Sequence, residues 1–176
     1  MHSLYTGVTQ SGKTTLARLN SREGLKHRIQ TVVYDPLGTA TAGGDWGEGA
    51  VIFQDIDPFL DLMYSPEFKD AMIYVDESHH IFSHENKEHL WLLTEGRHHG
   101  MNFNLITQRP TKLHPDARSN CGTCYMFRLA HDDARAVGND FGHSDIHKIN
   151  LDKGDFLVLT SGSAEYKTAN VFNLTT

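Results

Sequence analysis

Residues Gly7–Thr14 read G-V-T-Q-S-G-K-T, which fits the pattern G-x-x-x-x-G-K-[ST] of phosphate-binding loops. Glycines let the backbone of such a loop curl until successive N–H groups point at one anion, and a helix that begins near Lys13 adds its positive dipole end. The loop follows a short strand candidate and opens a helix candidate, which is the context that this pattern requires. The sequence therefore predicts a nucleotide-binding site in this segment.

The side chains of this loop have different expected roles. We expect Lys13 to reach the β- and γ-phosphates and Thr14 to place its hydroxyl on a bound Mg²⁺. The other expected nucleotide contacts are Gly7, Thr9, Gln10, Ser11, Gly12 and Thr15. The chain has no base-reading motif of the N-K-x-D type, which favours ATP over GTP as the nucleotide.

Two acidic residues end an apolar segment, Ala71–Glu77, which reads A-M-I-Y-V-D-E. Carboxylates at the end of a buried strand are costly unless a cation meets them, and Mg²⁺ with its waters would do so. We expect Asp76 to bind the magnesium shell and Glu77 to activate the water that attacks the γ-phosphate. The alternative is an ordinary pair of surface acids in a loop.

A second apolar segment, Asn104–Pro110, reads N-L-I-T-Q-R-P and ends in polar side chains. If its strand lies beside the phosphate loop, Gln108 would sit next to the γ-phosphate and could sense hydrolysis. The alternative is a glutamine that hydrogen-bonds loop backbone at a strand end.

Phosphoryl transfer also gains from a cation at the γ-phosphate, often an arginine supplied by a neighbouring subunit. The candidates are, in order of preference, Arg97, Arg118 and Arg128. Each of them could instead be an ordinary surface or helix-end arginine, and the sequence leaves that choice open.

Short apolar segments alternate with segments of helical character, which is typical of a mostly parallel sheet covered by helices, an α/β fold. The expected strands are His2–Tyr5, Thr31–Tyr34, Val51–Phe53, Met72–Val75, Asn104–Thr107 and Tyr125–Leu129, followed by a β-hairpin of Asp155–Thr160 and Tyr166–Phe172. The expected helices are Lys13–Leu25, Pro58–Lys69, Asn86–Arg97 and Asp132–Phe141. The first strand is the weakest, because His2 and Ser3 are poor choices for a buried parallel strand. The Gly- and Thr-rich segment Thr39–Gly49 is expected to be an exposed loop.

The composition suits one globular domain that spans residues 1–176, with 39% hydrophobic and 22% charged residues. The net charge of −6 argues against a strongly basic surface that coats nucleic acid, but leaves room for local phosphate contacts. No apolar stretch is long enough to suggest a membrane span, so we expect none. His79 and His80 are adjacent and point in different directions, so they are not expected to share a metal ion. Cys121 and Cys124 are expected to be reduced, partly buried thiols, and a disulfide or redox role is the alternative.

In their order along the chain, these motifs resemble a known family. The segments GVTQSGKTT, YDPLG, IYVDESHHIF, EGRHHGMNFNLITQRP and RSNCGTCYMFRL are similar to the HerA–FtsK superfamily of DNA-pumping P-loop ATPases. The short single-domain form is most similar to the genome-packaging ATPases of tailless, membrane-containing icosahedral viruses such as tectiviruses. The acidic strand, followed by R-H-x-G and then T-Q-R-P, is the discriminating part.

The resemblance implies a RecA-like (ASCE) P-loop fold, in which the glutamine-bearing strand separates the acidic strand from the phosphate-loop strand. It also implies a homo-oligomeric ring, usually a hexamer, with ATP bound between subunits and an arginine supplied by the next subunit. Double-stranded DNA would pass through the ring, held by sequence-independent phosphate contacts. The candidate DNA contacts are Lys112, His114 and Arg118. The implied partners are a viral capsid vertex or membrane proteins, and the implied location is the virion or the host cytoplasm during assembly.

The expected function is therefore an ATP-hydrolysing DNA translocase that packages a viral double-stranded DNA genome. Three other classes stay open. Zot-like (zonular-occludens-toxin-like) assembly ATPases of filamentous phages share the acidic strand and the glutamine motif, but usually carry a membrane segment. A small P-loop kinase would share the phosphate loop, but such kinases lack a catalytic glutamate at the position of Glu77. A nucleotide-dependent docking component with weak ATP use is the third class.

Overall fold

Eight strands form one sheet in the part of the chain that the computed structural model describes, residues 1–38 and 46–174. The strands are β1 (His2–Thr6), β2 (Gln30–Tyr34), β3 (Val51–Phe53), β4 (Ala71–Val75), β5 (Asn102–Thr107), β6 (Cys121–Phe127), β7 (Asp155–Thr160) and β8 (Tyr166–Asn170). Their order across the sheet is β3-β2-β4-β5-β1-β6-β7-β8. Strands β1 to β6 are parallel to one another, whereas β7 is antiparallel to β6 and β8 is antiparallel to β7. The predicted α/β class, the mostly parallel sheet and the closing hairpin are confirmed.

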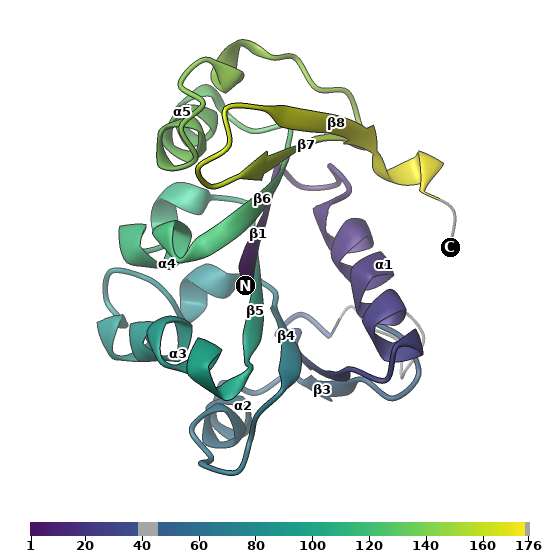
Figure 1. Cartoon of the computed structure of the whole chain (residues 1–176), viewed down its shortest axis with the longest axis vertical. Coiled ribbons are helices and arrows are strands. Elements are labelled where there is room, and N and C mark those ends of the chain that lie inside the picture. The colour runs from purple at the N-terminus through teal and green to yellow at the C-terminus, as the bar shows by residue number, and fades with distance from the viewer. Residues whose placement is uncertain (39–45, 175–176) are drawn as a thin grey trace.

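Helices cover the two faces of the sheet unequally. The α-helices are α1 (Lys13–Lys26), α2 (Ile56–Met63), α3 (Trp91–Thr94), α4 (Pro115–Ser119) and α5 (His131–Asp140). Short 3-10 turns are η1 (Ser78–His80), η2 (Lys87–Leu90), η3 (Gly96–His99), η4 (Pro110–Lys112), η5 (Ile146–Lys148) and η6 (Val171–Asn173). Among these α-helices, α1 lies on one face of the sheet and the other four lie on the opposite face (Figure 1). Over the described residues, no helix is both long and apolar enough to cross a lipid bilayer.

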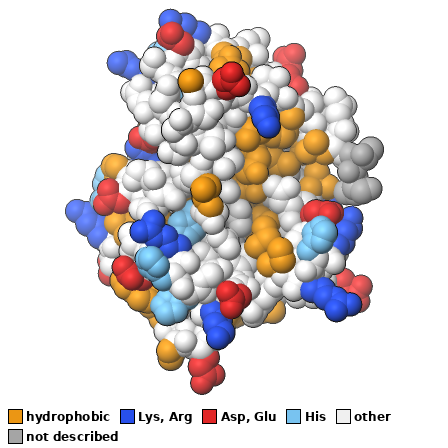
Figure 2. All heavy atoms as spheres, viewed as in Figure 1, with side chains coloured by type: hydrophobic (Ala, Val, Ile, Leu, Met, Phe, Trp, Pro, Cys, Tyr) orange, Lys and Arg blue, Asp and Glu red, His pale blue; other side chains and the backbone are white. Residues whose placement is uncertain are grey.

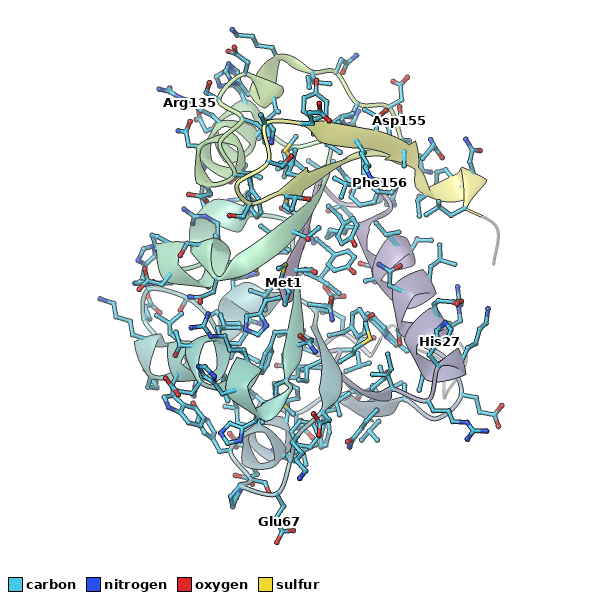
Figure 3. All side chains as sticks on the ribbon, viewed as in Figure 1. Met1, His27, Glu67, Arg135, Asp155 and Phe156 are labelled. Carbon is cyan, nitrogen blue, oxygen red and sulfur yellow. The ribbon has the colours of Figure 1, made fainter. Side chains whose placement is uncertain are left out.

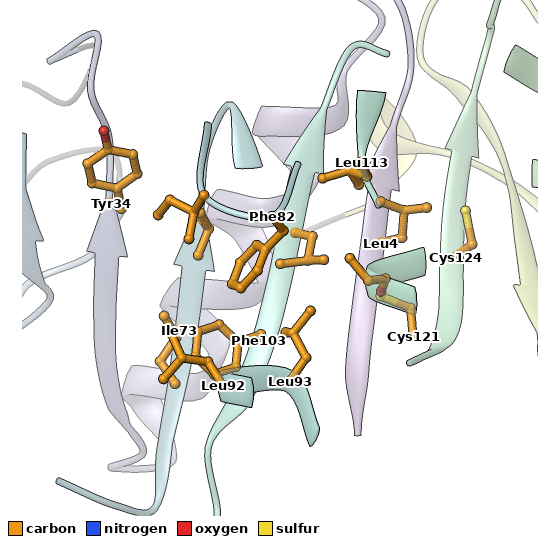
Figure 4. Close-up of a cluster of buried hydrophobic side chains, with 14 of the residues drawn as sticks. Leu4, Tyr34, Ile73, Phe82, Leu92, Leu93, Phe103, Leu113, Cys121 and Cys124 are labelled. Carbon is orange, nitrogen blue, oxygen red and sulfur yellow. The ribbon is translucent and has the colours of Figure 1, made fainter. Parts of the chain in front are cut away.

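A hydrophobic core lies on each face of the sheet. The larger core packs strand residues such as Ile73 and Phe103 against the four-helix side (Figure 4). Cys121 and Cys124 belong to this core as free thiols, and burial raises the pKa of Cys121 to about 12, so that thiol is protonated at neutral pH. The smaller core lies under α1, where Figure 2 shows hydrophobic side chains at the surface between this helix and the strands. Apolar burial on both faces explains the continuous hydrophobic strands.

The strand order brings the predicted motifs to one edge of the sheet. β5 lies between β4 and β1, as the resemblance implies, and all three strands are parallel. The phosphate loop follows β1, the acidic pair follows β4 and Gln108 follows β5. In open α/β sheets, ligands bind beyond the carboxyl ends of the strands.

β1 contains a buried histidine at a position where the sequence pattern disfavours one. His2 is 2% exposed, and both ring nitrogens are paired: Nδ1 accepts from the N–H of Phe103 at 3.0 Å, and Nε2 donates to the carbonyl of Leu93 at 2.8 Å. These bonds offset the desolvation cost of a buried imidazole. Burial lowers the pKa of His2, so the ring is a neutral link between β1, β5 and α3.

The segment predicted to be an exposed loop is partly core. Residues 39–45 lie outside the described residues, but Trp46 is fully buried under α1. Its indole N–H donates to Asp35 at 3.4 Å, its carbonyl accepts from the Ser21 hydroxyl at 2.6 Å, and the Arg18 guanidinium lies 5.3 Å from its ring. The prediction is wrong for Trp46, because this side chain supplies apolar area to the smaller core.

Two predicted helices have different bounds. The predicted helix over 58–69 begins earlier and ends at Met63, before Pro66, which disfavours helical backbone in the residue that precedes it. The predicted helix over 86–97 is divided into η2, α3 and η3, of which only α3 is α-helical. The hairpin strand β8 ends at Asn170, and η6 begins at the next residue, Val171.

Candidate active site

The phosphate loop, residues 7–12, connects the end of β1 to the start of α1. It is hydrogen-bonded to the residue that follows β6, because the N–H of Val8 donates to the carbonyl of Arg128 at 2.9 Å. Gly12 has a φ of 113°, and a Cβ at this position would come within 2.9 Å of Val171. Glycine alone adopts this backbone without strain, so the shape of the loop depends on Gly12.

The loop contains polar groups that fit a bound triphosphate. The hydroxyl of Ser11 is buried without a hydrogen-bond partner, and Lys13 is only 7% exposed. Burial lowers the pKa of Lys13, whereas the carboxylates of Asp76 and Glu77 raise it, so the ammonium lies near both acids. Phosphate oxygens would accept from these buried donors and from the first N–H groups of α1.

Asp76 is a buried carboxyl at the end of β4, 7% exposed. Burial raises its pKa to about 6, and the nearby carboxylates of Glu77 and Asp35 add to the effect, while a backbone hydrogen bond and Lys13 oppose it. Asp76 thus has two further carboxylates near it and only one nearby ammonium, that of Lys13, which leaves negative charge that a divalent cation would balance. Oxygen donors of this kind fit Mg²⁺, and Asp76 and the Thr14 hydroxyl are the predicted ligands.

Glu77 is joined to the phosphate loop through Gln108. The amide nitrogen of Gln108 donates to Oε1 of Glu77 at 2.9 Å, and its amide oxygen accepts from the Thr9 hydroxyl at 2.6 Å. Glu77 itself has left-handed backbone angles (φ 47°, ψ 44°), which a non-glycine residue rarely adopts and which persist where the surroundings hold them. The structure thus brings three predicted site residues into one hydrogen-bonded array, Thr9–Gln108–Glu77.

His79 lies against the same glutamate and has no role in the sequence-based predictions. Its Nδ1 is 3.5 Å from Oε2 of Glu77 and is buried without a hydrogen-bond partner. The two oxygens of Glu77 therefore face Gln108 and His79. Burial lowers the pKa of His79, the charges of His80 and Lys112 lower it further, and Glu77 raises it. The signal in the sequence is the D-E-x-H spacing, which places His79 two residues after Glu77.

Arg97, the first arginine candidate, is exposed in η3, just before β5 begins. This is the amino end of the parallel strands, and the charge of Arg97 acts on His2 at the start of β1. The phosphate loop lies at the opposite edge of the sheet. Arg97 is therefore out of reach of the phosphate loop of its own subunit.

Arg118, the second candidate, is buried in the interior of the protein. It is 8% exposed, and its guanidinium donates to the carboxylate of Asp140 and to the carbonyls of Pro110 and Leu113 at 3.1 and 2.8 Å. These bonds tie α4 to α5 and to the segment after Gln108. Because its guanidinium is bound to these protein partners, Arg118 is not available as an arginine finger or as a DNA contact, contrary to the expectation from the sequence.

Arg128, the third candidate, lies beside the phosphate loop of its own subunit. It is exposed directly after β6 and lines a cavity of 110 Å³. The lining residues of this cavity are Thr9, Gln10, Ser11, Arg128, Asp152 and Lys153. An arginine here could meet a nucleotide without a second subunit.

The two remaining DNA candidates differ in their surroundings. Lys112 is exposed, whereas the ring of His114 is largely buried and its Nδ1 accepts from the N–H of Asp116 at 3.2 Å, which caps α4. Lys112 lines a cavity of 710 Å³ that reaches His79. The lining residues are His79, His80, Ser83, His84, Glu85, Asn86, Thr111 and Lys112. These residues are of polar or ionisable types, and the three histidines and the lysine among them can carry positive charge.

Residues 52–150, more than half of the 176 residues, match the zonular occludens toxin (Zot) family. The chain belongs to the Zot family. The matched segment contains the acidic pair and Gln108 but begins after the phosphate loop. The N-terminal domain of zonular occludens toxin from Neisseria meningitidis has a similar structure, with a TM-score of 0.55, 16% identity, and coverage of 98% of this chain and 96% of that domain.

This Zot-family chain is also similar to proteins that act on nucleic acid. The genome packaging NTPase B204 of Sulfolobus turreted icosahedral virus 2 superposes with TM-scores of 0.75 in complex with ATP-gammaS and 0.77 with sulfate, at 20% and 22% identity. The superpositions cover 95% of this chain and 95% and 94% of B204. A 72-residue segment is 35% identical to a probable DNA double-strand break repair helicase HerA of Methanocaldococcus jannaschii and covers 38% of this chain but only 14% of that protein. The predicted resemblance to HerA–FtsK P-loop ATPases is confirmed.

Proposed function

We propose that this Zot-family protein is an ATP-driven motor that moves double-stranded DNA and packages a viral genome into a capsid. The similar proteins B204 and HerA are named a genome packaging NTPase and a probable DNA repair helicase, which supports DNA as the polymer that is moved. In this function the protein would work with capsid vertex or membrane proteins of a virus, in the virion or in the host cytoplasm during assembly.

The single observation that carries the proposal is the array Thr9–Gln108–Glu77. A phosphate loop binds nucleotides in proteins of many kinds, but hydrolysis needs a group that orients the attacking water. Glu77 offers such a group, and the hydrogen bond from the Gln108 side chain fixes the position of its carboxylate. Because Gln108 also contacts the loop through Thr9, it would register whether a γ-phosphate occupies the loop.

In the proposed reaction, Lys13 and the loop N–H groups hold the β- and γ-phosphates. Bound Mg²⁺ would neutralise phosphate charge during transfer, with Asp76 and Thr14 as the residues that would hold it. Glu77 accepts a proton from the water as the water attacks the γ-phosphorus, and Gln108 keeps the carboxylate oriented for that transfer. The phosphoryl group leaves ADP and is released as inorganic phosphate.

The position of Arg97 supports assembly into a ring. Because Arg97 lies at the edge of the sheet opposite its own phosphate loop, it can complete a site only between subunits. An arginine at the γ-phosphate stabilises charge in the transition state and raises turnover by about 10³ to 10⁵ in P-loop enzymes. We propose a homo-oligomeric ring, a hexamer as in the superfamily, in which Arg97 serves the neighbouring site.

The proposed DNA path passes Lys112. This residue ends the short turn η4, which begins two residues after Gln108, and its cavity also contains His79, the neighbour of Glu77. DNA phosphates in this cavity would therefore lie close to the hydrolytic array. Phosphate contacts without base readout suit a motor that must move along any sequence.

The proposed function is tested by measuring phosphate release with and without duplex DNA of two unrelated sequences. We expect DNA to stimulate turnover several-fold, independently of sequence and less at higher salt. Lys112→Ala should lose the stimulation and keep basal turnover, whereas Lys26→Ala, at an exposed lysine on α1, should behave like the wild type. A rate of ATP turnover that duplex DNA does not change would contradict the proposed function. So would transfer of phosphate only to a small-molecule acceptor.

A second candidate is an assembly ATPase of the kind expected for filamentous phages, which the match to the Zot family favours. Such a protein would use the same hydrolytic array to assemble or export a particle instead of pumping duplex DNA. In the same assay it would hydrolyse ATP at a rate that duplex DNA does not change. The comparison of phosphate release with and without duplex DNA therefore separates the two candidates.

A further inference from the structure

Phe172 is a large aromatic side chain that lies exposed beside the phosphate loop. It is 60% exposed and belongs to η6, which directly follows β8. The residue before it, Val171, is buried and packs against the loop, 2.9 Å from the position of a Cβ on Gly12. Figure 1 shows this C-terminal turn on the same side of the sheet as α1.

The backbone of Phe172 is held by a hydrogen-bonded side chain. Its N–H donates to Oδ1 of Asn170 at 2.9 Å, and Nδ2 of Asn170 donates to Oδ1 of Asp155 at 2.7 Å. Asp155, labelled in Figure 3, is the first residue of β7. Phe172 therefore sits at a defined place, although its ring is exposed.

Gly154 connects this turn to the phosphate loop and supports the ring. Its N–H donates to the carbonyl of Ser11 at 3.1 Å, and its carbonyl accepts from the N–H of Val171 at 2.9 Å. Its φ is 90°, and a Cβ here would lie 2.5 Å from two ring carbons of Phe172. One side of the ring thus rests on a backbone that has no side chain, and the rest of the ring stays open.

The reaction geometry places the nucleoside on this side of the site. In phosphoryl transfer, the attacking water and the leaving oxygen lie roughly in line on opposite sides of the γ-phosphorus. Glu77 and Gln108 follow β4 and β5, which lie on one side of β1 in the sheet. ADP must therefore extend away from them, toward the side of β6, β7 and β8, where Phe172 lies.

We infer that Phe172 is the platform on which the base of the bound nucleotide stacks. Aromatic rings stack on every nucleobase, so the contact needs no hydrogen bond that reads the base. It would select nucleotides over inorganic polyphosphate, which occupies the phosphate loop but has no base. This inference rests on the proposed ATPase function and adds the base subsite to it.

The test measures the dissociation constants of ATP and of inorganic tripolyphosphate, each with Mg²⁺, by calorimetry. For Phe172→Ala we expect the constant for ATP to rise about tenfold and that for tripolyphosphate to stay unchanged. Phe172→Trp, which keeps an aromatic face, should bind ATP like the wild type. Tyr166→Ala is the control, because Tyr166 is 42% exposed at the far end of β8.

The inference would be overturned if Phe172→Ala bound ATP as tightly as the wild type does. It would also be overturned if this variant lost affinity for tripolyphosphate as much as for ATP, since that result would indicate a distorted phosphate loop. A wild-type protein that binds neither ligand would instead overturn the proposed ATPase function, and the base subsite with it.

Discussion

The side-chain amide of Gln108 donates a hydrogen bond to the carboxylate of Glu77, with an N···O distance of 2.9 Å. The other end of the same amide accepts from Thr9 in the phosphate loop. An amide offers a donor and an acceptor together, which neither a carboxylate nor an ammonium does. Glutamine at this strand end can therefore orient the glutamate and contact the loop at the same time.

Replacing Gln108 by glutamate tests this arrangement with little change of size. The variant removes the amide donor and places a second carboxylate beside Glu77. We expect kcat for ATP hydrolysis to fall by about 100-fold, while the dissociation constant for ATP stays within about threefold of the wild type. Gln30→Glu makes the same chemical change at an exposed position at the start of β2 and should leave both constants unchanged. A Gln108→Glu variant with wild-type kcat would show that the array is not needed.

His79 should act as a positioning residue for Glu77, because its ring faces the second carboxylate oxygen. His79→Ala should lower kcat about tenfold and leave KM for ATP nearly unchanged, since the ring lies against the glutamate rather than in the phosphate loop. His79→Gln should recover part of the loss by offering a new amide donor. The exposed neighbour His80 lines the same cavity, so His80→Ala is the matched control. An equal effect of the two alanine variants on kcat would argue against a specific role for His79.

The proposed action of Arg97 across subunits can be tested by mixing two inactive proteins. Arg97→Ala and Lys13→Ala are each expected to be inactive alone. Mixed in equal amounts, they should recover about a quarter of wild-type turnover, because one interface in four of a random ring combines an intact Lys13 with an intact Arg97. A mixture of Lys13→Ala with Glu77→Gln should stay inactive, because one subunit supplies both Lys13 and Glu77 to a given site, so no site in the mixture has both residues intact. If the first mixture also stays inactive, Arg97 does not act in trans.

The buried His2 predicts a pH-dependent stability. Burial lowers its pKa below the ordinary value of 6.5, so below this pH the unfolded chain binds a proton that the folded chain excludes. Its contribution to the free energy of unfolding is therefore present above pH 6.5 and is lost as the pH falls toward the folded pKa. Urea unfolding at pH 7.5, 6.5 and 5.5 should show a smaller loss of stability for His2→Gln than for the wild type. His27→Gln, at an exposed histidine, is the control and should lose stability with falling pH as the wild type does. If His2→Gln also loses as much stability as the wild type, the pH dependence does not come from the buried His2.

The parts of the site that could be predicted from the sequence are those that a local pattern encodes. The phosphate loop, the acidic pair and Gln108 each end an apolar segment, and parallel strands place such ends at one edge of the sheet. Their proximity follows from the topology, whereas the bonds among Thr9, Gln108 and Glu77 depend on side-chain conformations that no spacing specifies.

The features that sequence reasoning missed depend on partners distant in the chain. His2 fits a buried strand because Leu93 and Phe103 supply an acceptor and a donor for its ring. Arg118 looked available for DNA, but Asp140 and two carbonyl groups hold it in the interior. Trp46 sits in a segment of loop-like composition and is buried because the face under α1 has room for an aromatic side chain. Single-residue properties do not reveal such partners.

The most direct measurement of the central claim compares Glu77→Gln with the wild type for ATP binding and for phosphate release. Glutamine keeps the size of the side chain but cannot accept the proton of the attacking water as a carboxylate does. We predict that the variant binds ATP with a dissociation constant within about threefold of the wild type and releases phosphate at least about 100-fold more slowly. Phosphate release at the wild-type rate by Glu77→Gln would contradict the claim that this protein hydrolyses ATP with a water activated by Glu77.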